Sequence, residues 1–172
     1  VTGVSSGTST IIYSDANGCT ASQVVTVVAA AAITGVLTVC VNATTALSNS
    51  SLPTAGNPWS SSNAAIASID ATGMVTGNAP GTTTITYTSS SNCMITATVT
   101  VIGIPVISGT FTVCEGSTST LTGASTPAVV NPWMSSDILV ATVSATGVVS
   151  AISVGTATLT FTNSNGCTAT QM

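Results

Sequence analysis

Alternation of apolar and polar side chains is the clearest pattern along the chain. Thr83, Ile85 and Tyr87 alternate with threonines at positions 82, 84, 86 and 88. Because successive side chains of a strand point to opposite faces, this pattern predicts a strand with one inward apolar face and one outward threonine face. The same alternation occurs at Ser9, Ile11 and Tyr13 and again at Ala157, Leu159 and Phe161.

Shorter apolar runs, separated by turn-forming residues, predict the other strands of one unit. They cover residues 36–41, 59–61, 66–69, 74–76 and 93–101, with turns at 70–73 and 78–81. Asp, Asn, Gly and Pro are frequent in such turns because they tolerate or impose the backbone angles that a turn requires. Short strands at this rhythm predict an all-β protein built of β-sandwiches.

A 74-residue internal repeat organises the whole chain. Residues of two kinds recur at this period: Trp59 and Trp133, Cys40 and Cys114, and the series Cys19, Cys93 and Cys167. A fixed period of this length indicates one structural unit per repeat. It predicts three parts: 1–29 as the last strands of a preceding repeat, 30–102 as a complete repeat, and 103–172 as a repeat that lacks its last strand.

The strand missing from the third part can be located by aligning the repeats. Met172 aligns with Val24, so the apolar run at residues 24–28 has no counterpart at the C-terminal end of the sequence. A sandwich without an edge strand exposes a row of unpaired backbone groups. We therefore expect the strand to come from a continuation of the polypeptide or from a neighbouring chain.

Each repeat carries a tryptophan, a glycine-valine hairpin and a glycine-threonine strand at fixed offsets. In the first repeat these begin at Trp59, Gly73 and Gly81, and in the second at Trp133, Gly147 and Gly155. The combination resembles the bacterial Ig-like domain of group 2 over nearly the whole chain. The resemblance implies tandem Ig-like sandwiches, in stalks or adhesive arrays on a bacterial surface, and therefore an extracellular location. It implies less about any ligand.

Charged side chains are almost absent, which excludes several function classes. The chain has no Lys, Arg or His, and its formal net charge is −4. Without basic residues it cannot neutralise phosphates, so we predict no nucleic-acid partner. The four carboxylates, Asp15, Asp70, Glu115 and Asp137, neither repeat nor cluster, and Asp70 is expected to begin a hairpin turn. We predict no metal, no cofactor and no enzymatic activity.

Five cysteines in a chain of this kind predict disulfides. Cys40–Cys93 and Cys114–Cys167 would each tie the first strand of a unit to its last, leaving Cys19 for a partner outside the segment. The alternative pairs, Cys19–Cys40 and Cys93–Cys114, would bridge neighbouring units. We favour the first scheme because it links two strands of one sandwich. A thiolate metal site is a weaker interpretation, since no Cys-x-x-Cys pair occurs.

The aromatic residues allow a binding interpretation and a structural one. Exposed tryptophans often anchor ligands, which makes Trp59 and Trp133 candidate binding residues. However, each unit has few aromatic side chains with which to fill its interior. We therefore predict a core position for both tryptophans and for Tyr13, Tyr87 and Phe161.

Two further sequence features concern membranes and glycans. Residues 24–41 carry no charge and are long enough to suggest a membrane span. The equivalent stretch one period later contains Pro105 and Glu115, so we interpret both as paired strands and expect no membrane insertion. Asn42 and Asn49 fit the N-glycosylation sequon, although their counterparts in the next repeat do not.

The surface composition leads to a hypothesis about function. The chain contains 25 Ser and 34 Thr residues but only four charged ones. Surface charge normally keeps soluble monomers apart, so a surface of this kind favours association. We expect a segment of an extracellular fibre, filament or cell-surface stalk, whose partners are copies of itself or adjoining repeats, with a glycan as a further candidate. The alternative is an adhesin array that binds a host or carbohydrate ligand.

Overall fold

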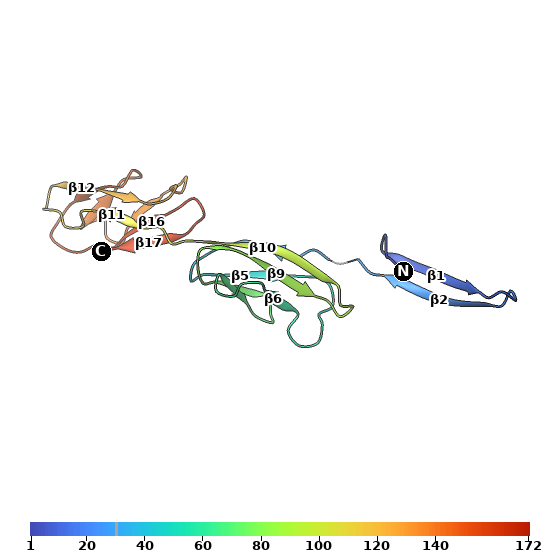
Figure 1. The fold of residues 1–172 in the computed structure, drawn as a ribbon. Coiled ribbons are helices and arrows are strands. Elements are labelled where there is room, and N and C mark those ends of the chain that lie inside the picture. Colours follow the sequence, from blue (N-terminus) through green and yellow to red (C-terminus); the bar gives the residue numbers. More distant parts are fainter. Residues whose placement is uncertain (30) are drawn as a thin grey trace.

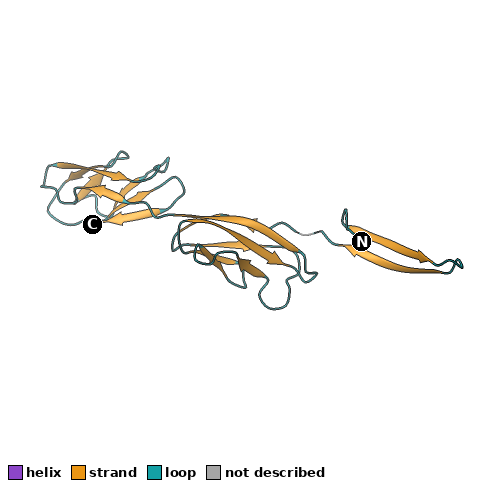
Figure 2. Cartoon of the chain, viewed as in Figure 1, coloured by secondary structure: helices purple, strands orange, loops and turns teal. Residues whose placement is uncertain are grey.

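The structure, a computed structural model, describes residues 1–29 and 31–172, which form strands and turns without a helix. Figure 1 shows three parts in a row: an N-terminal hairpin, a first sandwich and a second sandwich. In Figure 2, strands are the regular elements of each part. The predicted start of the complete repeat, residue 30, lies outside the described residues. A helix able to cross a membrane does not occur in the described ranges.

The N-terminal hairpin consists of β1 (Gly7–Ser14) and β2 (Thr20–Val27). The two strands pair antiparallel along their full lengths, from Gly7 opposite Val27 to Ser14 opposite Thr20. No other strand of the described chain packs on this hairpin, so its apolar face is open. Tyr13 is 69% exposed in the described chain, where no second sheet covers the hairpin, so its core position stays a prediction for the complete unit. A side chain on the face of a sheet that points toward the core is buried only where a second sheet covers that face.

The first sandwich contains two four-stranded sheets, with the orders β3-β5-β8-β7 and β4-β10-β9-β6. Its strands are β3 (Thr34–Gly35), β4 (Thr38–Cys40), β5 (Thr44–Ser48), β6 (Trp59–Ser61), β7 (Ala67–Ile69), β8 (Met74–Gly77), β9 (Gly81–Thr88) and β10 (Met94–Ile102). Sheet neighbours are antiparallel except β4 and β10, which run parallel with Thr38–Cys40 opposite Thr100–Ile102. The end of β4 therefore lies beside the end of β10.

The second sandwich repeats this arrangement with fewer paired residues. Its sheets have the orders β11-β12-β15-β14 and β13-β16-β17. The strands are β11 (Ile107–Gly109), β12 (Thr118–Gly123), β13 (Trp133–Ser135), β14 (Ala141–Val143), β15 (Val148–Ala151), β16 (Leu159–Thr162) and β17 (Thr168–Gln171). The all-β fold of tandem sandwiches predicted from the sequence is confirmed.

The core of each sandwich is built around its tryptophan. The Trp59 ring meets the Tyr87 ring edge-on at a centroid distance of 4.7 Å, and Trp133 meets Phe161 at 4.8 Å. These four aromatic side chains are buried, and on β9 the apolar side chain of Ile85 is buried beside them. Burial of such rings is a major part of the hydrophobic stabilisation of a small sandwich.

Gly73 shows why a glycine recurs in the hairpin before β8. Its φ angle is +88°, and a Cβ atom there would overlap the Leu47 carbonyl oxygen and approach Trp59 Nε1 at 3.2 Å. Its counterpart Gly147 has φ +85° and the same kind of neighbours, Leu121 and Trp133. Glycine is thus required here both for the backbone angle and for the close approach to the core tryptophan.

Substitution of Gly73 by alanine is expected to destabilise the first sandwich by several kcal/mol. Gly56→Ala is the matched control, because Gly56 also has a positive φ, +86°, but a Cβ there meets open space. The control should cost only the conformational term, about 1–2 kcal/mol. Urea unfolding of both variants measures the difference. Equal losses would contradict the role assigned to the contact with Leu47 and Trp59.

Candidate functional site: the junction between sandwiches

The first half of the junction is the tight turn that follows β4. The Ala43 N–H donates to the Cys40 carbonyl over 3.0 Å, and the Asn42 N–H donates to the Gly77 carbonyl over 2.8 Å. Asn42 has a φ of +64°, a conformation that Asn adopts more readily than most side-chain-bearing residues. The Val41 N–H donates to Ile102 at the end of β10 over 2.9 Å. Cys40 is thereby held where the chain leaves the first sandwich.

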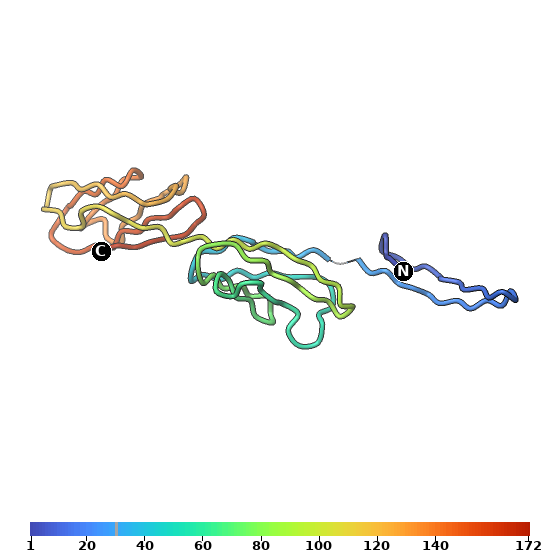
Figure 3. The backbone as a smooth tube through the Cα atoms, viewed as in Figure 1, coloured from blue at the N-terminus to red at the C-terminus, as the bar shows by residue number. Residues whose placement is uncertain are grey.

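The second half is the turn that joins β16 to β17. The Asn163 N–H donates to the Cys167 carbonyl, and Asn163 Oδ1 accepts from the Cys167 N–H, both over 2.9 Å. Gly166 takes the positive φ, +79°, that closes the turn. In Figure 3 this turn lies at the end of the second sandwich that faces the first. Cys167 is 1% exposed.

A disulfide joins these two turns. Cys40 and Cys167 are bonded, with a Cα–Cα distance of 5.6 Å and a sequence separation of 127. The bond crosses from the first sandwich to the second, whereas the predicted pairs, Cys40–Cys93 and Cys114–Cys167, lie within one unit. The structure corrects that prediction: Cys93 and Cys114 are unpaired in the described chain. The alternative pairs, Cys19–Cys40 and Cys93–Cys114, are not formed either.

The parallel pairing of β4 with β10 explains why the predicted pairing fails. Cys40 lies opposite Ile102, at the end of β10, while Cys93 immediately precedes the first residue of that strand. The eight residue steps of β10 span roughly 26 Å at about 3.3 Å per step. Disulfides require Cα atoms about 4.4–6.8 Å apart. The two cysteines therefore lie at opposite ends of the sandwich, too far apart to bond.

Two covalent connections therefore cross the junction. One is the disulfide, and the other is the four-residue link between β10 and β11, residues 103–106. Within this link Pro105 is buried, and the Val106 carbonyl accepts from the Ala124 N–H over 2.8 Å. Domains joined by one flexible linker move freely relative to each other. Here a second attachment restricts bending and twisting about the link.

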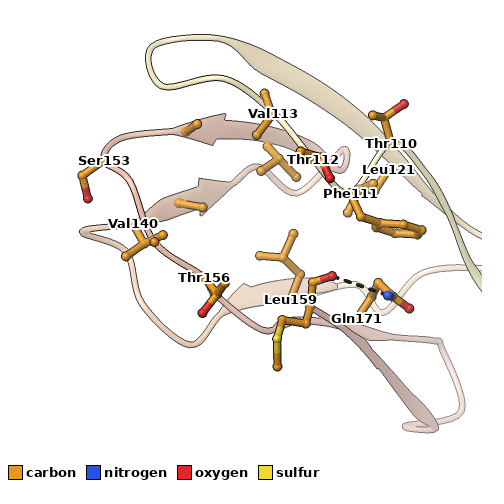
Figure 4. Close-up of a pocket in the computed structure, with 16 residues that line it drawn as sticks. Thr110, Phe111, Thr112, Val113, Leu121, Val140, Ser153, Thr156, Leu159 and Gln171 are labelled. Carbon is orange, nitrogen blue, oxygen red and sulfur yellow. Dashed lines mark hydrogen bonds between the residues drawn. The ribbon is translucent and has the colours of Figure 1, made fainter.

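The far end of the second sandwich contains an open cavity of about 240 Å³, lined by apolar and polar side chains. Figure 4 shows Phe111, Leu121 and Leu159 lining it from three segments of the chain, with Gln171 at its rim. Leu121 and Leu159 belong to the core, while Phe111 is 42% exposed. The cavity therefore opens the core of this sandwich at its C-terminal end.

In the first sandwich, strand β10 covers the part of the core that corresponds to this cavity. Val99 and Val101 of β10 are 0% and 2% exposed, and β10 pairs with β9 over eight positions. In the second sandwich β17 ends at Gln171 and pairs with β16 over four. Residues 112–114 and 155–158, the counterparts of β4 and of the first half of β9, lie outside any strand. A strand that continued β17 would pair with both segments and cover the cavity.

Three of the four carboxylates act as turn-forming acceptors. Asp70 Oδ1 accepts hydrogen bonds from the Thr72 hydroxyl at 2.6 Å and from the Thr72 and Met74 N–H groups at 2.8 and 3.0 Å, which confirms the predicted turn. Asp15 and Asp137 likewise accept from backbone N–H groups. At the equivalent positions in other repeats Ser89, Asn163, Ser144 and Asn63 do the same. A side-chain oxygen that accepts backbone hydrogen bonds therefore recurs at these positions, although a charged residue does not.

Asp70 provides a pH-dependent probe of the first sandwich. The Thr72 hydroxyl, followed by the Met74 N–H, holds the pKa of the Asp70 carboxyl below its usual range. A carboxyl whose pKa is lower in the folded state stabilises the fold at pH values above its unfolded pKa, and this contribution is lost as the pH falls through the folded pKa.

We expect Asp70→Asn to flatten the acid side of the stability–pH profile while keeping the turn, because the amide oxygen still accepts the backbone hydrogen bonds. Urea unfolding across the acidic range tests this, with an NMR titration of Asp70 as the direct measurement. An Asp70 pKa at or above the model-peptide range would contradict the assignment.

The two predicted glycosylation residues have different environments. The Asn42 side chain is exposed, and its positive φ is shared by Gly116 in the next repeat, so backbone geometry accounts for this residue. The Asn49 amide donates to the Ala31 carbonyl at 2.5 Å, and its oxygen accepts from the Ser51 N–H at 2.8 Å. The amide nitrogen to which a glycan would attach is thus already used within the fold at Asn49.

In the described chain, Cys, Asp and Glu side chains form no group of three or more that could hold a metal ion. The junction and the open end are instead structural features, and together with the fold they define a tandem array of Ig-like sandwiches. The chain matches the family model "Bacterial Ig-like domain (group 2)" over residues 24–102 and 100–172 and belongs to that family. The resemblance found in the sequence is thus confirmed.

Two of the solved structures similar to this chain are of intimin. A C-terminal fragment of intimin, solved in complex with the intimin-binding domain of the translocated intimin receptor, has 17% identity and a TM-score of 0.50, covering 84% of this chain and 63% of that one. An intimin mutant from EHEC O157:H7 has 27% identity over 42% of this chain and 39% of that one, with a TM-score of 0.33. The chain thus spans less than two thirds of either intimin chain. The curated proteins contain no match.

Proposed function

We propose that the chain is a structural segment of an extracellular fibre, filament or cell-surface stalk, in which Ig-like units follow one another along a common axis. The division into residues 1–29, 30–102 and 103–172 is part of this proposal. The observation that carries it is the Cys40–Cys167 bond, because a disulfide across a domain junction transmits force and fixes orientation without building any binding pocket. Disulfides of this kind persist in oxidising, extracellular compartments.

The surface supports a role in assembly rather than catalysis. Three of the four carboxylates are used in turns, and the chain has no basic side chain to pair with them. The N-terminal hairpin presents apolar side chains to solvent, with Ile12 64% and Val24 57% exposed. Such a hairpin suits contact with an adjoining unit or with a second copy of the chain. Lateral packing through serine and threonine faces would add to these contacts.

Electron microscopy of native material, labelled with an antibody against this chain, tests the stalk proposal. We expect the label along extended appendages at the cell surface, spaced at the length of the repeating units. Label confined to the cell interior, or to compact particles released from the cell, would contradict it.

Adhesion is a second candidate function, supported by one unrepeated feature. Val129 and Val130 are 99% and 73% exposed in a loop of the second sandwich, where the first sandwich has Ala55 and Gly56. Two adjacent exposed valines suit a recognition loop. Beads coated with the chain should then attach to host-cell or glycan surfaces, and the double substitution Val129→Ser, Val130→Ser should abolish attachment. Unchanged attachment would remove the loop from this role.

A further inference from the structure

Cys114 occupies the same kind of turn as the bonded Cys40. The Ser117 N–H donates to the Cys114 carbonyl over 2.9 Å, matching Ala43 and Cys40 at 3.0 Å. The Gly116 N–H donates to the Ala151 carbonyl over 3.0 Å, as Asn42 does to Gly77, and Gly116 has a positive φ of +77°. The Cys114 thiol is exposed and unpaired in the described chain.

Cys93 and Cys19 occupy the same kind of turn as the bonded Cys167. The Ser89 N–H donates to the Cys93 carbonyl over 3.0 Å, and the Cys93 N–H donates to Ser89 Oγ over 3.2 Å. In the N-terminal hairpin the Asp15 N–H donates to the Cys19 carbonyl over 2.9 Å, and the Cys19 N–H donates to Asp15 Oδ1 over 2.8 Å. The turns of Cys19 and Cys93 therefore share the hydrogen-bonding geometry of the turn that holds the disulfide-bonded Cys167.

Cys114 lies beside the open cavity in the second sandwich, just as Cys40 lies beside β10 in the first. Thr112 and Val113, directly before Cys114, line the cavity that a continuation of β17 would cover. In the first sandwich the strand that covers this place ends at Ile102, opposite Cys40, and a four-residue link leads to the unit whose turn cysteine bonds Cys40. A unit attached to the second sandwich in the same way would bring its turn cysteine to Cys114.

We propose that Cys114 forms a disulfide with the β16–β17-type turn cysteine of a further Ig-like unit of this kind, and that Cys93 forms the equivalent bond with the preceding unit. One disulfide then crosses every junction. Each unit contributes one cysteine in a turn like that of Cys40 and one in a turn like that of Cys167. This inference deepens the proposed stalk function and rests on it, since it requires units in series.

The bond forms by oxidation of two thiols. Each thiol loses a proton and one electron, and the S–S bond forms as the two electrons pass to a small-molecule disulfide oxidant, such as oxidised glutathione, which is reduced to two thiols by exchange. A disulfide requires Cα atoms about 4.4–6.8 Å apart, and a turn cysteine placed like Cys167 satisfies this at Cys40, with a Cα–Cα distance of 5.6 Å.

The test extends the full chain after Met172 with a second copy of its residues 99–172, which repeats the strand, the link and the second sandwich. The copy carries the substitution Thr170→Ser as a mass mark. The protein is oxidised with glutathione, its remaining thiols are alkylated, and it is cleaved at methionine with cyanogen bromide. The methionines at 74, 94, 134 and 172 place Cys93, Cys114 and Cys167 in separate fragments.

We expect fragment 95–134, which contains Cys114, to be linked to the mass-marked copy of fragment 135–172, and fragment 1–74 to be linked to the unmarked one. The variant Cys114→Ser should lose only the first link. An alkylated Cys114 beside an intact Cys40–Cys167 link would overturn the inference while leaving the stalk proposal standing. A link from fragment 95–134 to 75–94 or to the unmarked 135–172 would also overturn it.

A second measurement does not depend on the folding of the extended chain. Native protein is treated with iodoacetamide before extraction and then cleaved in the same way. Fragments 75–94 and 95–134 should each be found in disulfide linkage to a fragment from outside residues 1–172, with unmodified Cys93 and Cys114 after reduction. Quantitative alkylation of Cys114 in this material would overturn the inference.

Discussion

Reduction of the Cys40–Cys167 bond is expected to lengthen the chain under force by several hundred ångströms. When the oxidised protein is stretched from its two ends, the residues between the cysteines cannot extend, because the bond closes a loop with a sequence separation of 127. At about 3.6 Å per extended residue, the 127 residues released by a reductant correspond to a gain of roughly 460 Å, less the folded span. Single-molecule force spectroscopy measures this gain directly.

Two variants control this experiment. Cys40→Ser should show the full extension without reductant, whereas Cys93→Ser should behave like the parent chain, because Cys93 is unpaired in the described structure. Two separate gains of 53 residues each, the separations of Cys40–Cys93 and Cys114–Cys167, would contradict the bond across the junction. The experiment thus distinguishes a bond between sandwiches from a bond within each.

Removal of the Trp59 side chain is expected to produce the largest loss of stability among single substitutions in the first sandwich. Trp59 is 6% exposed and packs edge-on against Tyr87 at 4.7 Å, with the turn at Gly73 closing over its indole. Truncation of a buried tryptophan to alanine typically costs about 3–5 kcal/mol. Urea unfolding followed by circular dichroism should therefore show the first sandwich of Trp59→Ala unfolding at a lower denaturant concentration.

The remaining tryptophan makes this prediction sharper. In Trp59→Ala the one remaining tryptophan is Trp133, so tryptophan emission, excited selectively, reports on the second sandwich alone, and that transition should be unchanged. Leu52→Ala is the matched exposed control, since Leu52 is 77% exposed and its truncation should change stability by less than about 0.5 kcal/mol. A loss below about 1 kcal/mol for Trp59→Ala would place the indole outside the core.

The strands with strong alternation were predictable from sequence, and one weakly patterned strand was not. Strands β6, β7, β8, β9 and β10 fall within one residue or two of the predicted runs. Strand β5 was missed, because Leu47 is the only large apolar side chain in Thr44–Ser48. The predicted strand at 36–41 is shorter in the structure: only Thr38–Cys40 pairs with β10, and the separate strand at residues 34–35 pairs with β5 in the other sheet.

The turn residues were only partly predictable. Asp70 was identified from its place in a loop between apolar runs, and the hydrogen bonds of its carboxylate confirm that role. Charge alone does not reveal that Asp15, Ser89 and Asn163 play the same role in their turns. It depends on a side-chain oxygen that accepts the N–H four residues later, which three chemically different residues provide.

The sequence by itself determined the all-β class, the 74-residue period, the aromatic core positions of both sandwiches and the family, because these depend on local alternation and on residues that recur at fixed offsets. Tertiary structure alone decided the partner of Cys40 and the assignment of residues 34–35 and 38–40 to different sheets. A disulfide depends on which strand ends share one end of a sandwich, and that follows from the parallel pairing of β4 with β10.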